Sequence, residues 1–204
     1  MKNPWDNRER LEWLLAPRRQ TWFPRAPIVL ALELGEGAAV ADVGAGSGYL
    51  VEELAVAVGL AGRVWAVDPS PQARALLTER FQDEAHRQVV VRDGTAAATG
   101  LVDRSADGMV WLAIYHELLH ATPDGEELHR SFAEARRVLK PGGRLVIGDW
   151  RPVPTEVGPP TRERVDPERA GQALTAAGFT VASSTNLSEA VWLLTVTTPD
   201  DEPQ

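Results

Sequence analysis

One stretch of the chain decides the fold: Val40-Ala41-Asp42-Val43-Gly44-Ala45-Gly46-Ser47-Gly48. In it an apolar run leads into three alternating glycines, and a second apolar run, Val64 to Val67, follows downstream and ends in Asp68. Glycine is used where the backbone turns tightly or where a ligand approaches it closely. The free N–H groups at the start of a following helix favour an anionic group. The pattern predicts a strand, a turn, a helix and a second strand tipped by a carboxylate, which is how an α/β protein holds a nucleoside.

The spacing of the glycines separates two classes of nucleoside site. A dinucleotide fingerprint reads G-x-G-x-x-G, and Tyr49 stands at its third glycine position. The chain instead has G-x-G-x-G, with Asp42 two positions before the first glycine. Asp68, which lies 20 residues after Gly48, can accept hydrogen bonds from both ribose hydroxyls. This pattern resembles the first motif of the class I S-adenosylmethionine-dependent methyltransferases. The alternative of an NAD(P) oxidoreductase is disfavoured by Tyr49 and by the lack of a Tyr-x-x-x-Lys pair.

The composition indicates one domain whose partner is not a nucleic acid. A chain of 204 residues, 44% of them hydrophobic, is enough for one sizeable core. The formal net charge is −8 and no basic run is longer than two residues, so nucleic acid would be repelled. A small-molecule acceptor for the methyl group is therefore favoured, and a protein acceptor stays open.

Cysteine is absent from the chain. Disulfides, thiolate nucleophiles, Cys-ligated zinc and iron–sulfur clusters are thereby excluded, and with them radical chemistry with the same cofactor. No metal site is predicted. The first six residues lack an apolar signal segment, and no stretch approaches the roughly 18 apolar residues of a membrane span. The sequence thus predicts a cytoplasmic protein without a membrane span.

Strand and helix patterns alternate along most of the chain, which indicates a parallel sheet with helices on both faces. The predicted strands are residues 39–43, 63–67, 89–92, 108–112, 144–148, 179–183 and 190–197. The predicted helices between them are residues 47–58, 71–86, 125–138 and 167–177. A short polar loop joins the last two strands, which suits an antiparallel pair.

An aromatic-rich leader, residues 5–34, precedes the predicted sheet and holds three of the seven Trp residues. Residues 11–15 and 27–34 have the apolar pattern of two amphipathic helices, so we expect a helical cover on the sheet or over the pocket. Trp22 and Phe23 lie in a Pro-bounded turn and are predicted to form pocket walls. Core filling is the alternative for every Trp in the leader.

Two further strand tips carry candidate binding residues. The third strand ends before Asp93-Gly94, where a carboxylate can accept from the exocyclic amine of adenine, with a plain Asp-Gly turn as the alternative. The fourth strand ends in Trp111-Leu112. In the methyltransferase pattern this tip faces the methionine end of the cofactor, where a backbone carbonyl can accept from its ammonium group.

His116 is the one candidate general base. Imidazole titrates near neutrality, and His116 follows the fourth strand, just past the expected reacting edge. The alternative is that His116 and Glu117 only open or pack a short helix. Methyl transfer to a nucleophile that is already ionised needs no base, because alignment supplies much of the acceleration.

The segment Arg136 to Ile147 supports the same family. A helix that ends in R-V-L-K-P-G-G before an apolar strand is typical of class I methyltransferases, where it turns the chain into the next strand. The resemblance covers about residues 25–197. It implies a Rossmann-like α/β fold with a seven-stranded sheet of order 3-2-1-4-5-7-6, strand 7 antiparallel, and helices on both faces. Residues 1–34 would form the helical N-terminal cover, 35–198 the methyltransferase domain and 199–204 an acidic tail.

A finer resemblance is to a bacterial branch related to the ubiquinone and menaquinone C-methyltransferases. It is carried by four short motifs: His116-Glu-Leu118, Asp149-Trp-Arg151, Gly158-Pro-Pro160 and Ala176-Ala-Gly-Phe179. Substrates within that branch are diverse, so the likeness implies a reaction type and no particular acceptor. Arsenite methyltransferases of the same superfamily depend on cysteines, which argues against that activity here.

The resemblance implies S-adenosylmethionine as the cofactor and S-adenosylhomocysteine as its product. The residues that it assigns to cofactor binding are Asp42, Gly44, Ala45, Gly46, Ser47, Gly48, Asp68, Pro69, Ser70, Asp93, Gly94, Trp111 and Leu112. The expected function is methyl transfer to a small-molecule acceptor, with His116 as the candidate catalytic residue. The alternatives are cofactor binding without catalysis and methylation of a protein. A homodimer is compatible with the sequence.

Residues 151–166 form a long segment of Pro, Gly and charged residues. Loops of this length are often lids or binding loops. Arg162 and Arg164 are predicted either to be solvated or to meet an anionic substrate.

Overall fold

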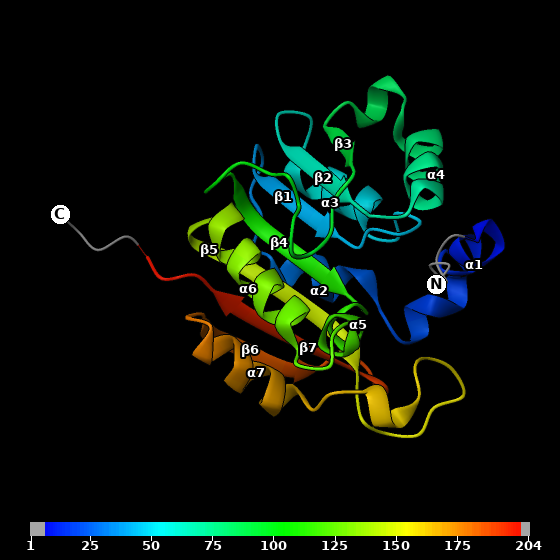
Figure 1. Ribbon diagram of the computed structural model, residues 1–204. Coiled ribbons are helices and arrows are strands. Elements are labelled where there is room, and N and C mark those ends of the chain that lie inside the picture. Colours follow the sequence, from blue (N-terminus) through cyan, green and yellow to red (C-terminus); the bar gives the residue numbers. More distant parts are fainter. Residues whose placement is uncertain (1–6, 201–204) are drawn as a thin grey trace.

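Seven strands form one sheet in the order β3-β2-β1-β4-β5-β7-β6 (Figure 1). The computed structural model describes residues 7–200. The strands are β1 Ala39–Val43, β2 Arg63–Val67, β3 Val89–Arg92, β4 Ala106–Leu112, β5 Leu139–Trp150, β6 Thr180–Asn186 and β7 Val191–Thr197. The first five are parallel, and β7 pairs antiparallel with both β5 and β6. The predicted Rossmann-like architecture and strand order are confirmed.

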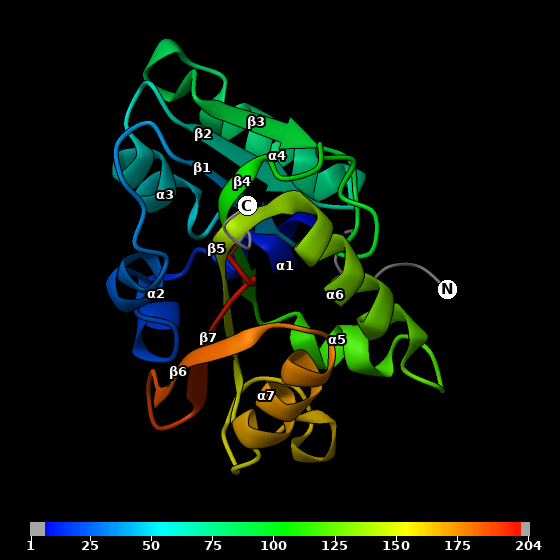
Figure 2. The same ribbon diagram turned by 90° about the vertical axis from the view of Figure 1, so that its left-hand side faces the viewer.

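Helices cover both faces of the sheet. They are α1 Arg8–Trp13, α2 Arg25–Ala31, α3 Val51–Val58, α4 Pro71–Phe81, α5 Tyr115–His120, α6 Glu126–Val138 and α7 Pro167–Ala176, with short 3₁₀ helices at Pro17–Thr21, Glu84–His86 and Thr161–Glu163. Figure 2 shows α2 and α3 on one side of the sheet and α6 and α7 on the other. Along β4, Met109 and Trp111 pack in the layer with α6 and α7, while Val110 and Leu112 pack with α2 and α3. The strand is buried on both faces, as a central parallel strand must be.

The helix after the glycine turn begins later than predicted. It starts at Val51 and not at Ser47. Gly44, Gly46 and Gly48 have φ angles of 74°, 54° and 77°, in the left-handed region that a right-handed helix cannot contain. The turn therefore extends four residues further than the periodicity of the sequence suggested.

The largest differences elsewhere are at two other predicted boundaries. The helix expected to reach residue 86 ends at Phe81. The strand expected to begin at residue 144 begins at Leu139, because Leu139 already pairs with Ala106 of β4. Both errors lie at element ends, and neither changes the topology.

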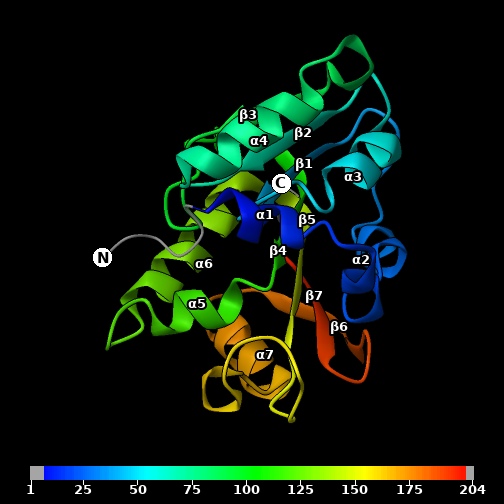
Figure 3. The same ribbon diagram turned by 90° about the vertical axis from the view of Figure 1, so that its right-hand side faces the viewer.

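The leader lies across the carboxyl ends of the strands. Figure 3, which looks toward those ends, shows α1 below α4 and in front of the sheet. Leu11 of α1 is buried against Ala73 and Leu76 of α4, and Arg8 forms an ion pair with Glu79 at 3.0 Å. Helix α1 thus lies over the edge where ligands of α/β sheets bind. Trp5 of the leader and the last four residues of the acidic tail lie outside the described residues.

Within residues 7–200, every helix is too short or too polar to cross a membrane.

Candidate active site

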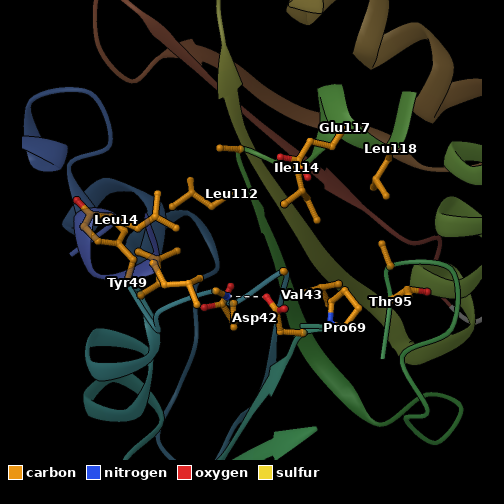
Figure 4. Close-up of a pocket in the computed structure, with 18 of the residues that line it drawn as sticks. Leu14, Asp42, Val43, Tyr49, Pro69, Thr95, Leu112, Ile114, Glu117 and Leu118 are labelled. Atoms are coloured by element: carbon orange, nitrogen blue, oxygen red, sulfur yellow. Dashed lines mark hydrogen bonds between the residues drawn. The ribbon is translucent and has the colours of Figure 1, made fainter. Parts of the chain in front are cut away.

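A cavity of about 350 Å³ opens at the carboxyl ends of β1, β2 and β4 (Figure 4). The glycine turn, the tip of β2, the start of α5 and α1 form its walls. The strand order reverses between β1 and β4, which is where open α/β sheets bind ligands. Seven of the predicted cofactor residues line the cavity: Asp42, Gly44, Ala45, Gly46, Asp68, Pro69 and Leu112.

Six predicted cofactor residues lie outside the cavity wall: Ser47, Gly48, Ser70, Asp93, Gly94 and Trp111. Ser70 caps α4, because its Oγ accepts a hydrogen bond from a backbone N–H of the first turn at 3.2 Å. Asp93 is exposed and forms an ion pair with Arg74 at 2.9 Å. The side chain of Trp111 lies on the face of the sheet that α6 covers, opposite to Leu112, and stacks on Phe132 with ring centroids 6.1 Å apart. Only the backbone of Trp111 can therefore belong to this site.

The carboxylate of Asp68 ties the glycine turn to the start of α4. Its Oδ2 accepts a hydrogen bond from the backbone N–H of Gly46 at 2.8 Å, and its Oδ1 accepts one from Ser70 N–H at 2.8 Å. Each carboxylate oxygen can accept a second hydrogen bond. Asp68 thus orients the turn and lies in the cavity wall, where a carboxylate is an acceptor for a ligand hydroxyl.

Asp42 supplies a buried carboxyl group at the base of the cavity, as Figure 4 shows. Its pKa is raised to about 7: burial is the main cause, the positive charge of Arg19 opposes it, and the negative charge of Asp68 adds to it. Arg19 comes from the leader, and burial lowers its own pKa to about 10. Its guanidinium lies 4.3 Å from the ring centroid of Tyr49 and donates a hydrogen bond to the carbonyl of Leu14 at 3.2 Å. The cavity thus contains a carboxyl group that is costly to ionise unless a cation lies near it.

Replacing Asp42 by Asn is expected to stabilise the ligand-free protein more at pH 8 than at pH 5. The folded state keeps a proton that the unfolded chain loses between the ordinary pKa of 3.8 and the raised pKa of about 7, so stability falls as the pH rises through this window. At pH 8 the ionised carboxylate costs on the order of a few kcal/mol. Urea unfolding at both pH values measures the effect. A gain of equal size at both would contradict the assignment.

A second cavity of about 980 Å³ adjoins the first. The two cavities share five wall residues: Leu14, Arg19, Ala113, Glu117 and Ala121. Aromatic side chains from three segments line the second cavity, namely Trp13, Trp22, Phe23 and Trp150. Trp22 and Phe23 are thus pocket-wall residues, as predicted from their place in the leader.

His116 lines this second cavity. Asp149, at the end of β5, holds its ring: the two side chains are 2.9 Å apart from Nδ1 to Oδ1, and the backbone N–H of His116 donates to Oδ2 at 3.1 Å. Burial lowers the pKa of His116, but the hydrogen bond and charge of Asp149 outweigh burial, so the pKa is raised above its ordinary value. With Nδ1 bound to the carboxylate, Nε2 is the nitrogen that can exchange a proton in the cavity.

A family model described as a methyltransferase domain matches residues 41–147, more than half of the chain. The chain belongs to the class I S-adenosylmethionine-dependent methyltransferases. The matched residues include the glycine turn, the tips of β2 and β4, and the segment that turns into β5.

Individual relatives agree with this assignment. The methyltransferase is 33% identical over 132 residues to 27-O-demethylrifamycin SV methyltransferase of Amycolatopsis mediterranei, a match that covers 62% of this chain and 44% of the relative. It is 31% identical over 125 residues to an arsenite methyltransferase of Aquipseudomonas alcaligenes, covering 59% of this chain and 35% of the relative. The matches thus span less than half the length of these two curated relatives.

A solved structure extends the likeness to nearly the whole chain. A SAM-dependent methyltransferase from Aquifex aeolicus superposes with a TM-score of 0.83 at 25% identity, covering 94% of this chain and 98% of that one.

The residues of the first cavity fit S-adenosylmethionine. Gly46 lines the cavity with backbone alone, and an added Cβ there would be in van der Waals contact with Leu14 Cδ1 at 3.6 Å. Asp68 offers acceptor capacity for ribose hydroxyls, and the buried Asp42 gains from a cationic neighbour, which the ammonium and sulfonium groups of this cofactor supply. A volume of about 350 Å³ lies within the range of small-molecule pockets.

Arg164 organises the loop that forms the far wall of the methyltransferase's second cavity. Its guanidinium donates hydrogen bonds to the carbonyls of Arg151, Val153, Val157 and Pro159 and to Thr155 Oγ1. It also lies 5.3 Å from the ring of Trp150. Neither prediction for Arg164, solvation or contact with an anionic substrate, was right, because the loop folds around its side chain. Arg162 is solvated, with a side chain 81% exposed.

The sequence reasoning missed three side chains of the site. Arg19 gave no signal, because nothing in its neighbours marks it as buried. The position of Asp149 did give a signal, because it lies at the end of an apolar strand. The carboxyl ends of parallel strands meet at one edge of the sheet. Glu117 was noted only as a neighbour of His116, although it lies in the wall shared by both cavities.

Proposed function

We propose that this protein transfers a methyl group from S-adenosylmethionine, bound in the first cavity, to a small molecule bound in the second. The observation that carries the proposal is the shared wall: one cavity has the nucleoside-binding turn, the other has aromatic walls, and five residues border both. Such an arrangement brings a donor and an acceptor into contact, and alignment of this kind supplies much of the acceleration of a bimolecular reaction.

The residues of the chain have distinct tasks in this reaction. When bound, S-adenosylmethionine supplies a methyl group activated by a positively charged sulfur. Gly46 and Asp68 would hold the nucleoside, and Asp42 would face the charged methionine end. Leu11 and Leu14, from the leader, cover the cavity and exclude water from it. The protein thus contributes binding, orientation and desolvation.

The name of one relative, 27-O-demethylrifamycin SV methyltransferase, supports a small-molecule acceptor. The arsenite methyltransferase is a poorer guide to the acceptor, because this chain has no cysteine. The resemblance to the ubiquinone and menaquinone branch supports the reaction type and names no particular acceptor atom. Cofactor binding without catalysis and methylation of a protein remain the alternative functions.

S-adenosylhomocysteine is expected to raise the melting temperature of the protein by about 5–10 °C at 100 times its dissociation constant, because ligand binding to the folded state adds about 2.7 kcal/mol. A thermal shift assay with NAD in parallel provides the comparison. Stabilisation by NAD alone would overturn the proposal. Release of S-adenosylhomocysteine with a panel of small acceptors then separates a catalyst from a cofactor-binding protein.

A further inference from the structure

We propose that the second cavity binds a flat, largely apolar molecule that carries a hydroxyl group on an aromatic ring or an enol, and that His116, positioned by Asp149, takes the proton of this hydroxyl. The proposal rests on the proposed function, because the hydroxyl oxygen must lie beside the bound methyl donor. It names the class of acceptor and the chemistry that prepares it for methylation.

The walls of the second cavity suit a flat apolar ligand. Trp150 makes an edge contact with Phe23 at 5.2 Å and a tilted contact with Trp22 at 6.2 Å between ring centroids. Gly158 packs against the indole of Trp150, where an added Cβ would lie 2.8 Å from Cδ2, and Arg164 lies on the same indole. These contacts hold the aromatic cluster in place, and aromatic clusters of this kind bind planar rings by stacking and edge contacts.

The geometry of His116 suits a general base. The side chain of Asp149 is 2% exposed and holds Nδ1 at 2.9 Å, while the backbone N–H of Trp150 donates to the same carboxylate at 2.6 Å. This carboxylate fixes the orientation and the tautomer of the imidazole, as the acid does in other carboxylate–histidine pairs. Nε2 is then the atom that receives a proton from a ligand in the cavity. Asp149 lines neither of the two cavities, so we assign it the role of a positioning residue.

The charges around the cavity favour a neutral acceptor that ionises only after binding. His116 is faced by Asp149 from β5, by Glu117 from its own helix and by Glu163 from the loop. Arg10, Arg19 and His120 line the same cavity. Acidic and basic groups are thus mixed, without the cluster of cations that a phosphate or another strong anion requires.

The proposed step balances in atoms and charge. The O–H bond of the acceptor breaks and its proton passes to Nε2 of His116. An electron pair of the oxygen forms the new O–CH₃ bond as the S–CH₃ bond breaks, and the electrons of that bond remain on sulfur. The positive charge leaves the sulfur and is carried by the imidazolium, which Asp149 stabilises. An amine acceptor needs no such prior deprotonation, because its neutral nitrogen is already a good nucleophile and can lose a proton after the transfer.

The test uses 4-nitrophenol as a probe, with the full chain and without S-adenosylmethionine. Its ionised form absorbs at longer wavelength than its neutral form, and Trp fluorescence reports its arrival among the aromatic side chains. We expect bound probe to be more ionised than free probe at the same pH. In His116→Gln this ionisation should be lost while quenching of fluorescence persists. In Asp149→Asn the pH at which half of the bound probe is ionised should shift, and part of the extra ionisation of the bound probe should remain.

Two further variants complete the design. His129→Gln, an exposed histidine on α6, should behave as the wild type. Trp22→Ala should weaken probe binding about tenfold, because it removes one aromatic wall. With S-adenosylmethionine present, turnover of the probe by His116→Gln should fall about 100-fold or more.

The outcomes separate this inference from the proposed function. Failure of the probe to bind, or ionisation that is the same with and without His116, would overturn the acceptor class while S-adenosylhomocysteine still binds. A methyl group found on carbon or nitrogen of the product would also overturn it. If the wild-type protein does not bind S-adenosylhomocysteine, the proposed function itself is overturned.

Discussion

Replacing Gly48 by Ala is expected to destabilise the protein by about 2–5 kcal/mol. Its φ of 77° costs a residue with a side chain about 1–2 kcal/mol. The new Cβ would also lie 2.7 Å from Phe81 Cε2 and 2.8 Å from Leu77 Cδ2, and relief of such overpacking costs about 1–3 kcal/mol. Both neighbours are buried in α4, so neither can move aside freely. Denaturant unfolding measures the loss.

A matched control separates the backbone from the packing. Gly37 has a φ of 82°, and a Cβ there would meet no atom within 4 Å. Gly37→Ala should therefore cost only about 1–2 kcal/mol. If both variants lose the same free energy of unfolding, the contact of the new Cβ with α4 contributes nothing to the destabilisation. Because Gly48 ends the turn that carries the cofactor site, Gly48→Ala should also weaken S-adenosylhomocysteine binding, and Gly37→Ala should not.

Replacing Arg164 by Met is expected to open the loop of residues 151–166 and to disrupt the second cavity. The variant removes a donor from four backbone carbonyls. The carbonyls of Arg151 and Val157 keep a second donor, whereas those of Val153 and Pro159 have no other donor among the described residues. An acceptor left without a partner costs about 1–3 kcal/mol where it is buried. These hydrogen bonds lie within the loop, so the loop should unfold locally under conditions in which the rest of the protein stays folded. Hydrogen exchange of the loop amides should accelerate about 100-fold or more, and binding of 4-nitrophenol should weaken about tenfold.

Arg162→Met provides the control, because this neighbouring arginine is solvated and bonds only to Glu163 among the described residues. It should leave both hydrogen exchange and probe binding unchanged. S-adenosylhomocysteine binding should be the same in both variants, since the first cavity has no wall from this loop. Slow exchange in Arg164→Met would mean that the loop is held by other contacts.

Local patterns were enough to predict the strands and the glycine turn, and the resemblance to the methyltransferases supplied the order of the strands. The alternation of apolar runs with helical segments marks the strands, and the spacing of Gly44, Gly46 and Gly48 marks the turn. Asp42 and Asp68 flank that turn in sequence, and the structure brings both into the cavity wall. The start of α3 was missed because periodicity extends through residues 47–50 although the glycine backbone cannot be helical there.

The direction of the side chains could not be predicted at the tip of β4, where both Trp111 and Leu112 were assigned to cofactor binding. Neighbouring residues of a strand point to opposite faces, so Trp111 and Leu112 could not both face the ligand. Leu112 lines the first cavity, and Trp111 packs against α6. The alternation is visible in the sequence, but the face that holds the cavity depends on where the leader packs.

The sequence by itself determined the fold, the turn and the class of methyl donor, because each of these depends on residues that are close along the chain. Only the tertiary structure decided which side chains form the second cavity, where the acceptor is proposed to bind. His116 and Asp149 are 33 positions apart, and Arg19 and Trp22 reach the site from a leader that packs across the strand ends. These neighbours meet through the packing of distant elements, and no local spacing encodes that packing.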